Sequence, residues 1–525
     1  MFETLFIFPL AFWVVVAILI GGGIWAIRHL RDGTGIPMLT LLGTVAVWYL
    51  GDALYNDYAN NHVKLFDAAT LANAWWQVAW FVAVFLWATP WLHGHLNARY
   101  LRRTSGVVQI FKHGVGQPVF QRQLTQLFLG CAWVWTVLAV IAIILLRERA
   151  VHFFFPFFGQ KTSPWNHGQI GKGFDSLSIV AIYLHLLVAG VFGVVAALST
   201  NRRTFALALF CCLTSWPYFI LDRTRNIILA VVIPGVLSWI FLRLRGGMVK
   251  KLTVLGICFL LVNAWMGFVI ANRDDKSIIG ALKEKGFNLK ENQSVHHLGL
   301  NMYEELCWIN TFMQRGTYTC NWGYRYWTEL VNPIPRILWP GKPYIGLDYA
   351  AARGAESADD EGGVGVSVTL STGMIGGGVV NFGRLIGPAF AALLMSFWAA
   401  ILARLDLQIH EFGRLPLYGL GLILTFNMGR DITLITLYPF VFGALLVWWR
   451  ERSRRAGVHP TIRQSNQSKS RLQMLRRQRT LPHTAFGRRW KRGPDRSGHG
   501  SSHPIVASDA PGAKAPTSPL HPDAR

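Results

Sequence analysis

Long apolar stretches recur along most of this chain, and they constrain its fold more than any other feature. Several run for roughly 18 or more residues, enough for a helix to cross a hydrocarbon core of about 30 Å. Only 15% of the residues are charged, whereas an average soluble domain carries about 25%. The sequence therefore predicts an all-α polytopic membrane protein.

The predicted transmembrane helices number about eleven. The first, over residues 6–26, lacks a basic leading region and a small-residue cleavage site, so we expect a retained span. The others cover residues 38–55, 75–92, 127–146, 177–198, 205–221, 227–244, 252–271, 386–403, 417–428 and 432–449.

Four regions follow from this pattern. We expect eight spans within residues 1–271, and a large external, periplasmic loop domain over residues 272–376 between the eighth and ninth spans. Residues 377–449 hold the last three spans. Residues 450–525 are basic and poor in apolar residues, so we expect a disordered cytoplasmic tail.

Basic residues fall in every second loop, which predicts the orientation. They flank the spans at Arg28 and Arg31, Arg99 to Arg122, Arg202 and Arg203, Arg243 to Lys251, and Arg404 and Arg414. Because such residues concentrate in cytoplasmic loops, we expect the N-terminus outside and the C-terminus in the cytoplasm of a bacterial inner membrane. The net charge of +24 therefore indicates membrane orientation, because the excess lies in loops that flank the spans and in the tail. We expect no nucleic-acid partner.

The external segment has internal pattern. Apolar residues at helical spacing predict a helix over residues 298–313, and an aromatic-rich helix is predicted over residues 324–331. From Gly341 to Gly378 the composition favours a mobile loop. Cys307 and Cys320 lie on the oxidising side, where either a disulfide or two free thiols is possible.

Arginines at the outer ends of spans are the main candidates for chemistry. Arg223, Arg225 and Arg430 are predicted on the external side, where positive charge is unusual. A guanidinium group matches phosphate oxygens in bidentate fashion, so these residues suit a lipid-linked diphosphate. The alternative is local ion pairing with Asp222 and Asp431, which would contribute little.

A general base is harder to select. His296, His297, Glu304, Glu305 and Glu329 could each remove a hydroxyl proton in group transfer, although each is more often a surface residue. Arg273 is a further candidate for anion binding, with less weight because it lies at the start of the predicted external segment. We find no metal-ligand spacing, phosphate loop or nucleophile elbow, and expect neither metal nor cofactor.

Two strings in the later half resemble a known family. Pro335-Arg336-Ile337-Leu338-Trp339-Pro340-Gly341-Lys342-Pro343 resembles the P-R-x-L-W-P-x-K-P signature of bacterial oligosaccharide repeat-unit polymerases, the O-antigen and exopolysaccharide (Wzy-type) polymerases. Ser371 to Gly378 with Asn381-Phe382-Gly383 resembles the family's small-residue turn and N-F-G. Arg223 to Arg225 and Gly429-Arg430-Asp431 resemble its two arginine sites.

The resemblance implies a metal-independent membrane glycosyltransferase that polymerises polyprenyl-diphosphate-linked oligosaccharide repeat units. It implies catalytic roles for Arg225, Arg430, Glu304 and His297, and substrate-binding roles for Arg223, Arg273, Arg336, Lys342 and Trp339. Partners would be the lipid-linked oligosaccharide, with a chain-length regulator and a flippase of the same pathway. Trp308, Trp322, Tyr324, Tyr326 and Trp327 could stack on sugar faces, or serve packing and an interfacial belt.

Three other functions stay open. An O-antigen ligase type would share the membrane body and the large outer loop but deliver the glycan to another acceptor. A glycolipid transporter would bind diphosphate without chemistry, and would be expected to show internal repeats and mid-span charges. A membrane scaffold acting through the basic tail is the third.

Overall fold

The structure is a computed structural model that describes residues 7–156, 175–221, 225–271, 301–331, 338–343, 371–411, 413–430 and 440–453, with residues 334, 349, 352, 353, 432 and 437. The chain divides into two units, Met1–Arg454 and Arg455–Arg525, and every described residue belongs to the first. The predicted tail therefore lies almost entirely outside the described residues.

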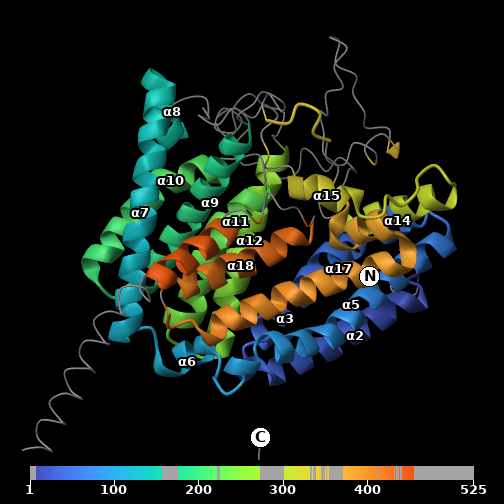
Figure 1. Ribbon diagram of the computed structural model, residues 1–525, viewed down its shortest axis with the longest axis horizontal. Helices are drawn as coiled ribbons and strands as arrows, with labels where there is room; N and C mark the ends of the chain where they lie inside the picture. Colours follow the sequence, from blue (N-terminus) through green and yellow to red (C-terminus); the bar gives the residue numbers. More distant parts are fainter. Residues whose placement is uncertain are drawn as a thin grey trace, which may run out of the picture. The chain divides into compact units, whose positions relative to one another are not determined.

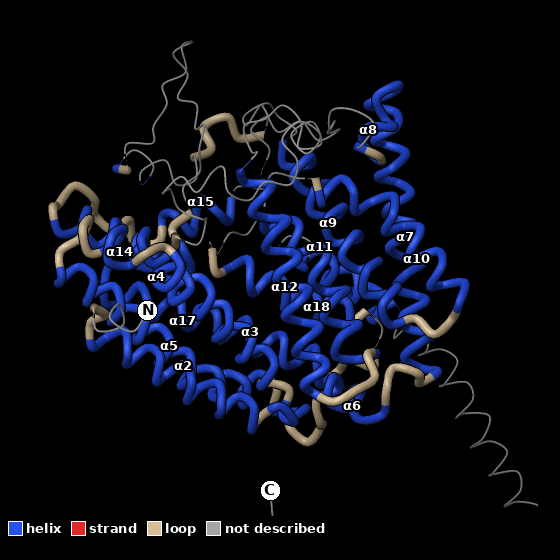
Figure 2. The backbone as a smooth tube through the Cα atoms, turned by 180° about the vertical axis from the view of Figure 1, so that it is seen from behind, coloured by secondary structure: helices blue, strands red, loops and turns tan. Residues whose placement is uncertain are grey.

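The described residues form helices and loops, without a strand among them (Figures 1 and 2). The N-terminal half comprises α2 (Leu10–Arg28), η1 (Leu30–Asp32), α3 (Gly35–Val45), η2 (Ala46–Leu50), α4 (Gly51–Tyr55), η3 (Tyr58–His62), α5 (Ala68–Leu96), η4 (Ala98–Tyr100), α6 (Gly106–His113), α7 (Pro118–Leu146), η5 (Arg147–Arg149), α8 (Ala150–Phe154), α9 (Asp175–Leu198), α10 (Arg202–Ile220), α11 (Arg225–Ser238), η7 (Trp239–Arg243) and α12 (Met248–Ala271). The rest comprises α14 (Met302–Gln314), α15 (Tyr324–Val331), α17 (Gly373–Leu407) and α18 (Arg414–Met428), followed by helical residues 440–453.

Among the described residues, six helices are long and apolar enough to cross a membrane. They are Leu10–Arg28, Gly35–Leu54, Ala68–Leu96, Phe120–Phe154, Arg202–Ile220 and Gly373–Leu407. Two shorter apolar helices cover Leu184–Leu198 and Val231–Arg243. The all-α membrane class is thus confirmed at this level, and the count of about eleven spans stays a prediction.

The helices pack in two neighbouring groups. In one, α5 contacts both α2 and α17, while α3 contacts α2, α17 and α18. In the other, α9 contacts α7, α10 and α11. Most buried apolar side chains of both groups belong to one continuous core, which also includes residues of α14. The segment after residue 301 therefore packs on the membrane helices.

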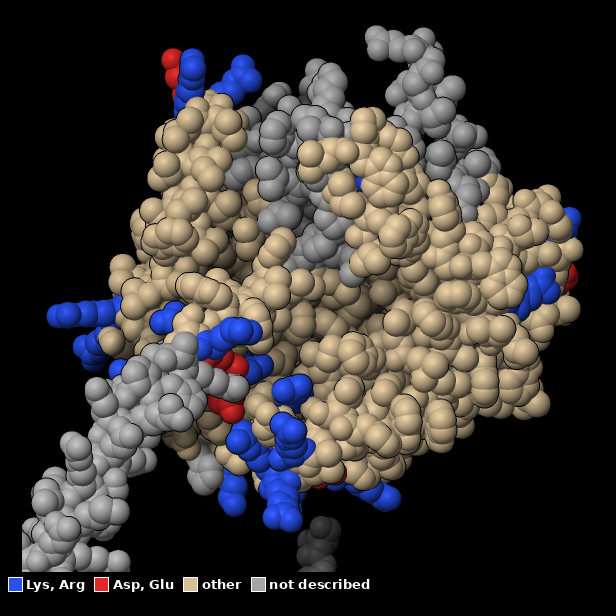
Figure 3. All heavy atoms as spheres, viewed as in Figure 1, with Lys and Arg blue, Asp and Glu red and all other residues tan. Residues whose placement is uncertain are grey.

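Basic loops meet at one end of the bundle, here called the basic end (residues 97–123, 198–203, 243–251 and 403–414). Arg103 pairs with Glu411 at 3.3 Å, and Gln121 Nε2 donates to the Leu198 carbonyl at 3.0 Å. Arg243 Nη1 donates to the Ser199 carbonyl at 2.5 Å. In Figure 3, Lys and Arg side chains gather at this end, near α6.

The opposite end carries α14 and α15 (Figure 1) and is called the α14 end. There α17 is sharply kinked at Gly383, where φ is 78° and ψ is 179°. The two pieces of α17 pack closely against each other: a methyl group added at Gly378 would overlap the carbonyl oxygen of Gly387. Glycine is needed at Gly383 for the positive φ and at Gly378 for the close approach.

The kink corrects one expectation. The sequence predicted a small-residue turn and a mobile loop as far as Gly378. This prediction is wrong from Gly373 onward, because α17 begins there and residues 373–381 are buried. Glycine lowers helix propensity, but here its missing side chain permits close helix packing. A methyl group at Gly376, for example, would press on the Ile309 side chain of α14.

Candidate functional site

Helix α14 lies at the centre of the α14 end, where it contacts η2, α4, α5 and α17. Its apolar spacing was predicted, and Tyr303, Leu306, Cys307 and Ile309 are all fully buried. Its polar residues also face neighbours: the side-chain amides of Gln77 on α5 and Asn310 exchange two hydrogen bonds, each 2.8 Å long. Arg384 of α17 donates to the Asn310 carbonyl at 2.9 Å. These contacts fix α14 on the membrane helices.

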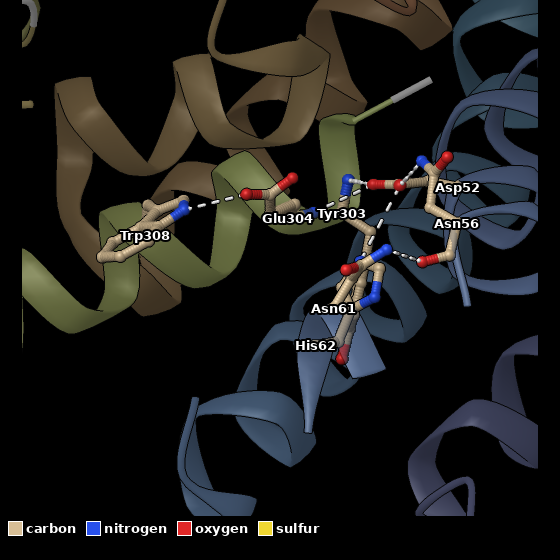
Figure 4. Close-up of polar contacts among 7 residues, drawn as sticks. All are labelled: Asp52, Asn56, Asn61, His62, Tyr303, Glu304 and Trp308. Atoms are coloured by element: carbon tan, nitrogen blue, oxygen red, sulfur yellow. Dashed lines mark hydrogen bonds and ion pairs between the residues drawn. The ribbon is translucent and has the colours of Figure 1, made fainter. Parts of the chain in front are cut away.

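The start of α14 is capped by Asp52, a buried acidic residue of α4 (Figure 4). Its Oδ2 accepts hydrogen bonds from the backbone N–H of Tyr303 at 2.9 Å and of Glu304 at 3.0 Å. Asn301, at the usual capping position, makes no side-chain cap. Asp52 thus satisfies two N–H groups that α14 cannot satisfy itself.

Residues after α4 support this carboxylate. Asn56 Nδ2 donates to Asp52 Oδ1 at 2.7 Å, and Asn61 Nδ2 donates to the Asn56 carbonyl at 2.6 Å (Figure 4). His62 Nε2 lies 3.7 Å from Asp52 Oδ1, with both side chains fully buried. Polar side chains of residues 52–62 therefore hold the Asp52 carboxylate in place at the start of α14.

Two carboxylates follow on α14, and both are buried. Glu304 Oε1 accepts from Trp308 Nε1 at 3.1 Å (Figure 4). Glu305 accepts from the Tyr349 hydroxyl at 2.6 Å and from Arg353 Nη2 at 3.2 Å. The expectation of surface carboxylates is therefore wrong, because α14 turns this edge toward other parts of the protein.

Electrostatics at Glu305 favour an ion pair. Burial raises the pKa of Tyr349 well above its usual range, so its hydroxyl stays protonated and donates. Burial opposes the charge of Arg353, but the charge and hydrogen bond of Glu305, together with Tyr349 and Glu304, outweigh it and raise the Arg353 pKa. The Arg353 guanidinium also lies 4.4 Å from the ring centroid of Trp308, within cation–π range.

Arg430 lies beside the start of α17. Its carbonyl accepts from the Gly373 N–H at 2.8 Å, and its Nε donates to Ser371 Oγ at 2.8 Å. The side chain is exposed, and among the described carboxylates none pairs with it. Asp431, its predicted alternative partner, lies outside the described residues. The Ser371 contact orients the guanidinium while leaving its terminal nitrogens for another acceptor.

Arg430 and α14 are neighbours across Gly373. A methyl group at Gly373 would press on the Tyr49 hydroxyl and the Met302 side chain. The Tyr49 hydroxyl also accepts from the Ile375 N–H at 3.0 Å. The structure thus joins an exposed guanidinium, the start of α17 and the capped start of α14 at one place.

Other predicted site residues are placed only in part. Arg225 begins α11, which contacts α18 and ends at the basic end, so its backbone lies at the same end as Arg430. Its side chain lies outside the described residues. So do His297, Arg223, Arg273 and Arg336, together with Asp222 and His296.

Two predicted site residues of the proline-rich string, Trp339 and Lys342, lie among the described residues. Lys342 is buried, and its Nζ donates to the Ile334 carbonyl at 2.9 Å. Its N–H donates to the Trp339 carbonyl at 3.1 Å, while Trp339 is half-buried. Lys342 therefore braces this loop, which favours a structural role over direct substrate binding.

The cysteine alternatives are resolved in favour of free thiols. Cys307 and Cys320 are both unpaired by disulfide bonds. Cys307 is completely buried on the α14 face that packs on the membrane helices, whereas Cys320 is half-buried next to Gly383 of α17. The structure therefore contains no disulfide between Cys307 and Cys320.

Sequence reasoning missed Asp52, Ser371 and Arg353. Asp52 had one available signal, an acidic residue at the end of an apolar stretch, which is expensive there and often functional. Within the described residues, no cluster of His, Cys, Asp and Glu could hold a metal ion. The site offers anion-binding and hydrogen-bonding groups.

A scan against protein-family models, a search of curated proteins and a search of solved structures each gave no match. The described residues thus define an all-helical protein with six candidate membrane spans and a polar site at the end opposite its basic loops.

Proposed function

We propose that this protein is a bacterial inner-membrane glycosyltransferase that polymerises polyprenyl-diphosphate-linked oligosaccharide repeat units. The proline-rich string at residues 335–343 and the later arginine turn at Arg430 support this proposal. The gathering of basic residues at the far end supports a cytoplasmic basic end and an external site. The polyprenyl chain would then lie in the membrane, with its diphosphate at the depth of Arg430.

The geometry of Arg430 carries the proposal. A guanidinium held through Nε, at the end of a membrane helix, presents its terminal nitrogens for bidentate contact with phosphate oxygens. Arg225 would act with it from the start of the neighbouring α11. Both would stabilise the negative charge that develops on the diphosphate as it leaves.

In the reaction, a hydroxyl at the non-reducing end of one repeat unit attacks the anomeric carbon of the donor glycan. The bond between that carbon and the diphosphate oxygen breaks, and polyprenyl diphosphate leaves. The hydroxyl proton passes to a base, for which His297 and Glu304 are the candidates. The burial of Glu304 and its bond to Trp308 favour a positioning role for this carboxylate.

The glycan profile of a deletion strain tests this function. A polymerase predicts loss of polymer with a single repeat unit still transferred to its final acceptor. Accumulation of lipid-linked polymer would instead indicate a ligase, and repeat units retained on the cytoplasmic face would indicate a transporter. Complementation with the intact gene should restore the normal profile, and a wild-type profile in the deletion strain would refute all three.

A further inference from the structure

Helix α15 is amphipathic in the reverse of the usual sense for an external helix. Its exposed face carries Tyr324, Trp327 and Leu330, which are 53%, 50% and 56% exposed. Its buried face carries Arg325 and Glu329, at 5% and 3%. A helix surrounded by water normally buries apolar residues and exposes charge.

Neighbouring residues extend the apolar face. Trp322 is 73% exposed and lies in a turn with φ of 50°, a conformation uncommon for a bulky residue. Leu338, after α15, is also largely exposed. Large apolar side chains are thus exposed at several described positions between residues 322 and 338, and exposed apolar surface of this kind marks an interaction site.

The position of α15 identifies what covers this face. The Gly323 N–H donates to the Asn381 carbonyl at 3.3 Å, and the Tyr326 N–H donates to Asn381 Oδ1 at 3.2 Å. The Tyr326 ring centroid lies 5.8 Å from that of Phe390, within the spanning helix Gly373–Leu407. Helix α15 is therefore packed against the candidate span of α17, near the α14 end.

Lipid-facing residues begin at the same level. Leu385, two residues after the kink of α17, is 75% exposed, and its carbonyl accepts from Trp80 Nε1 at 3.1 Å. Trp76 and Trp80 are exposed on α5. From Trp76 to Leu96, α5 spans about 30 Å, the thickness of a hydrocarbon core. Tryptophan is enriched at that boundary.

We propose that α15 lies in the outer membrane–water interface, with Trp322, Trp327 and Leu330 inserted among phospholipid acyl chains and Tyr324 at headgroup level. A glycan would be an alternative occupant of exposed aromatic rings. Leucine gives no flat ring for a sugar face, however, and the polar residues of α15 that would bind hydroxyl groups are turned inward. This placement is independent of the glycosyltransferase chemistry proposed above.

Photo-crosslinking in vesicles tests the placement. The full-length protein carries p-benzoylphenylalanine in place of Trp327 or Leu330 and is reconstituted in phosphatidylethanolamine and phosphatidylglycerol. Phe397, exposed on the span of α17, is the positive control. Arg315 is the negative control. It follows Gln314, whose Oε1 accepts from Thr70 Oγ1 at 3.0 Å. Thr70 lies about two helical turns before Trp76 on α5, and thus outside the proposed hydrocarbon core.

After irradiation, we expect phospholipid adducts at positions 327 and 330 at about the yield of position 397, and at least about tenfold above position 315. Mass spectrometry identifies the adducts, and unchanged thermal unfolding shows that each variant is folded. Yields at the level of position 315 would overturn the proposal. So would carbohydrate adducts that replace lipid adducts at position 327 in intact cells.

Discussion

Asp52 Oδ2 lies 2.9 Å from the backbone nitrogen of Tyr303, although 251 residues separate them in the chain. This contact joins the candidate span Gly35–Leu54 to α14, the first described helix after residue 271. It holds Tyr303 and Glu304 at the centre of the site.

Replacing Asp52 by Asn should loosen α14. The side chain keeps its shape but exchanges one acceptor oxygen for an amide donor, so it can no longer accept from both Asn56 and the two N–H groups of α14. We expect a loss of about 1–3 kcal/mol in stability from the buried donors left unsatisfied, measured as a lower thermal unfolding midpoint in detergent. Asp57→Asn, at an exposed capping carboxylate, is the matched control and should have little effect. Equal midpoints for both variants would contradict the capping role.

Replacing Arg430 by Ala should stop chain extension. Loss of one charge-stabilising donor typically lowers a rate by about 100-fold or more, so polymer should fall to trace levels on a glycan gel. Arg430→Lys keeps the charge without the planar fork and should restore only part of it. Arg225→Ala should behave like Arg430→Ala.

Arg315→Ala is the control for both arginines, because this residue is exposed at the same end. Protein level and membrane insertion should be normal in all four variants. Polymer of normal length from Arg225→Ala and Arg430→Ala would remove the diphosphate-binding role.

Adding a methyl group at Gly378 should destabilise the kink of α17. The new atom would overlap the Gly387 carbonyl, so the two pieces of α17 must separate. We expect Gly378→Ala to cost about 1–3 kcal/mol. Gly43→Ala has open space around it and should be neutral or slightly stabilising. Thermal unfolding of both variants checks this, and a tolerant Gly378 would mean that the pieces do not touch.

Cys307 and Cys320 should differ in reactivity. Burial raises the pKa of Cys307 well above its usual range, so at neutral pH its reactive thiolate is scarce, and it increases only as pH rises toward that pKa. A membrane-impermeant maleimide added to spheroplasts at pH 7.5 should label Cys320 and not Cys307. Labelling should disappear in Cys320→Ser and reach Cys307 only after denaturation.

The same experiment reports on pairing and orientation. Labelling of Cys320 only after reduction would indicate a disulfide. Labelling only in inverted vesicles would place this end in the cytoplasm, and the proposed mechanism would fail with the orientation.

Local pattern predicted part of this structure well. The aromatic-rich helix was expected over residues 324–331, and α15 has these bounds. The buried residues of α14 follow the predicted spacing. These features depend on neighbours within a few turns, which the sequence displays directly.

Features that depend on distant contacts were not predictable. The partner of Asp52 comes from another part of the chain, and nothing in residues 51–62 indicates which helix it caps. The burial of Glu304 and Glu305 likewise depends on Trp308, Tyr349 and Arg353. Glycines 376–378 have low helix propensity, and only packing against Ile309 and Gly387 explains their helical conformation.

The cap on α14 also affects how the protein is made. The ribosome synthesises Asp52 about 250 residues before Tyr303, a delay of roughly 10–50 s at usual bacterial rates. During that interval the carboxylate has no helix to bind and must stay hydrated at the membrane surface. Nascent chains that end before residue 302 should therefore leave this aspartate accessible to water, and its burial marks a late step of biogenesis.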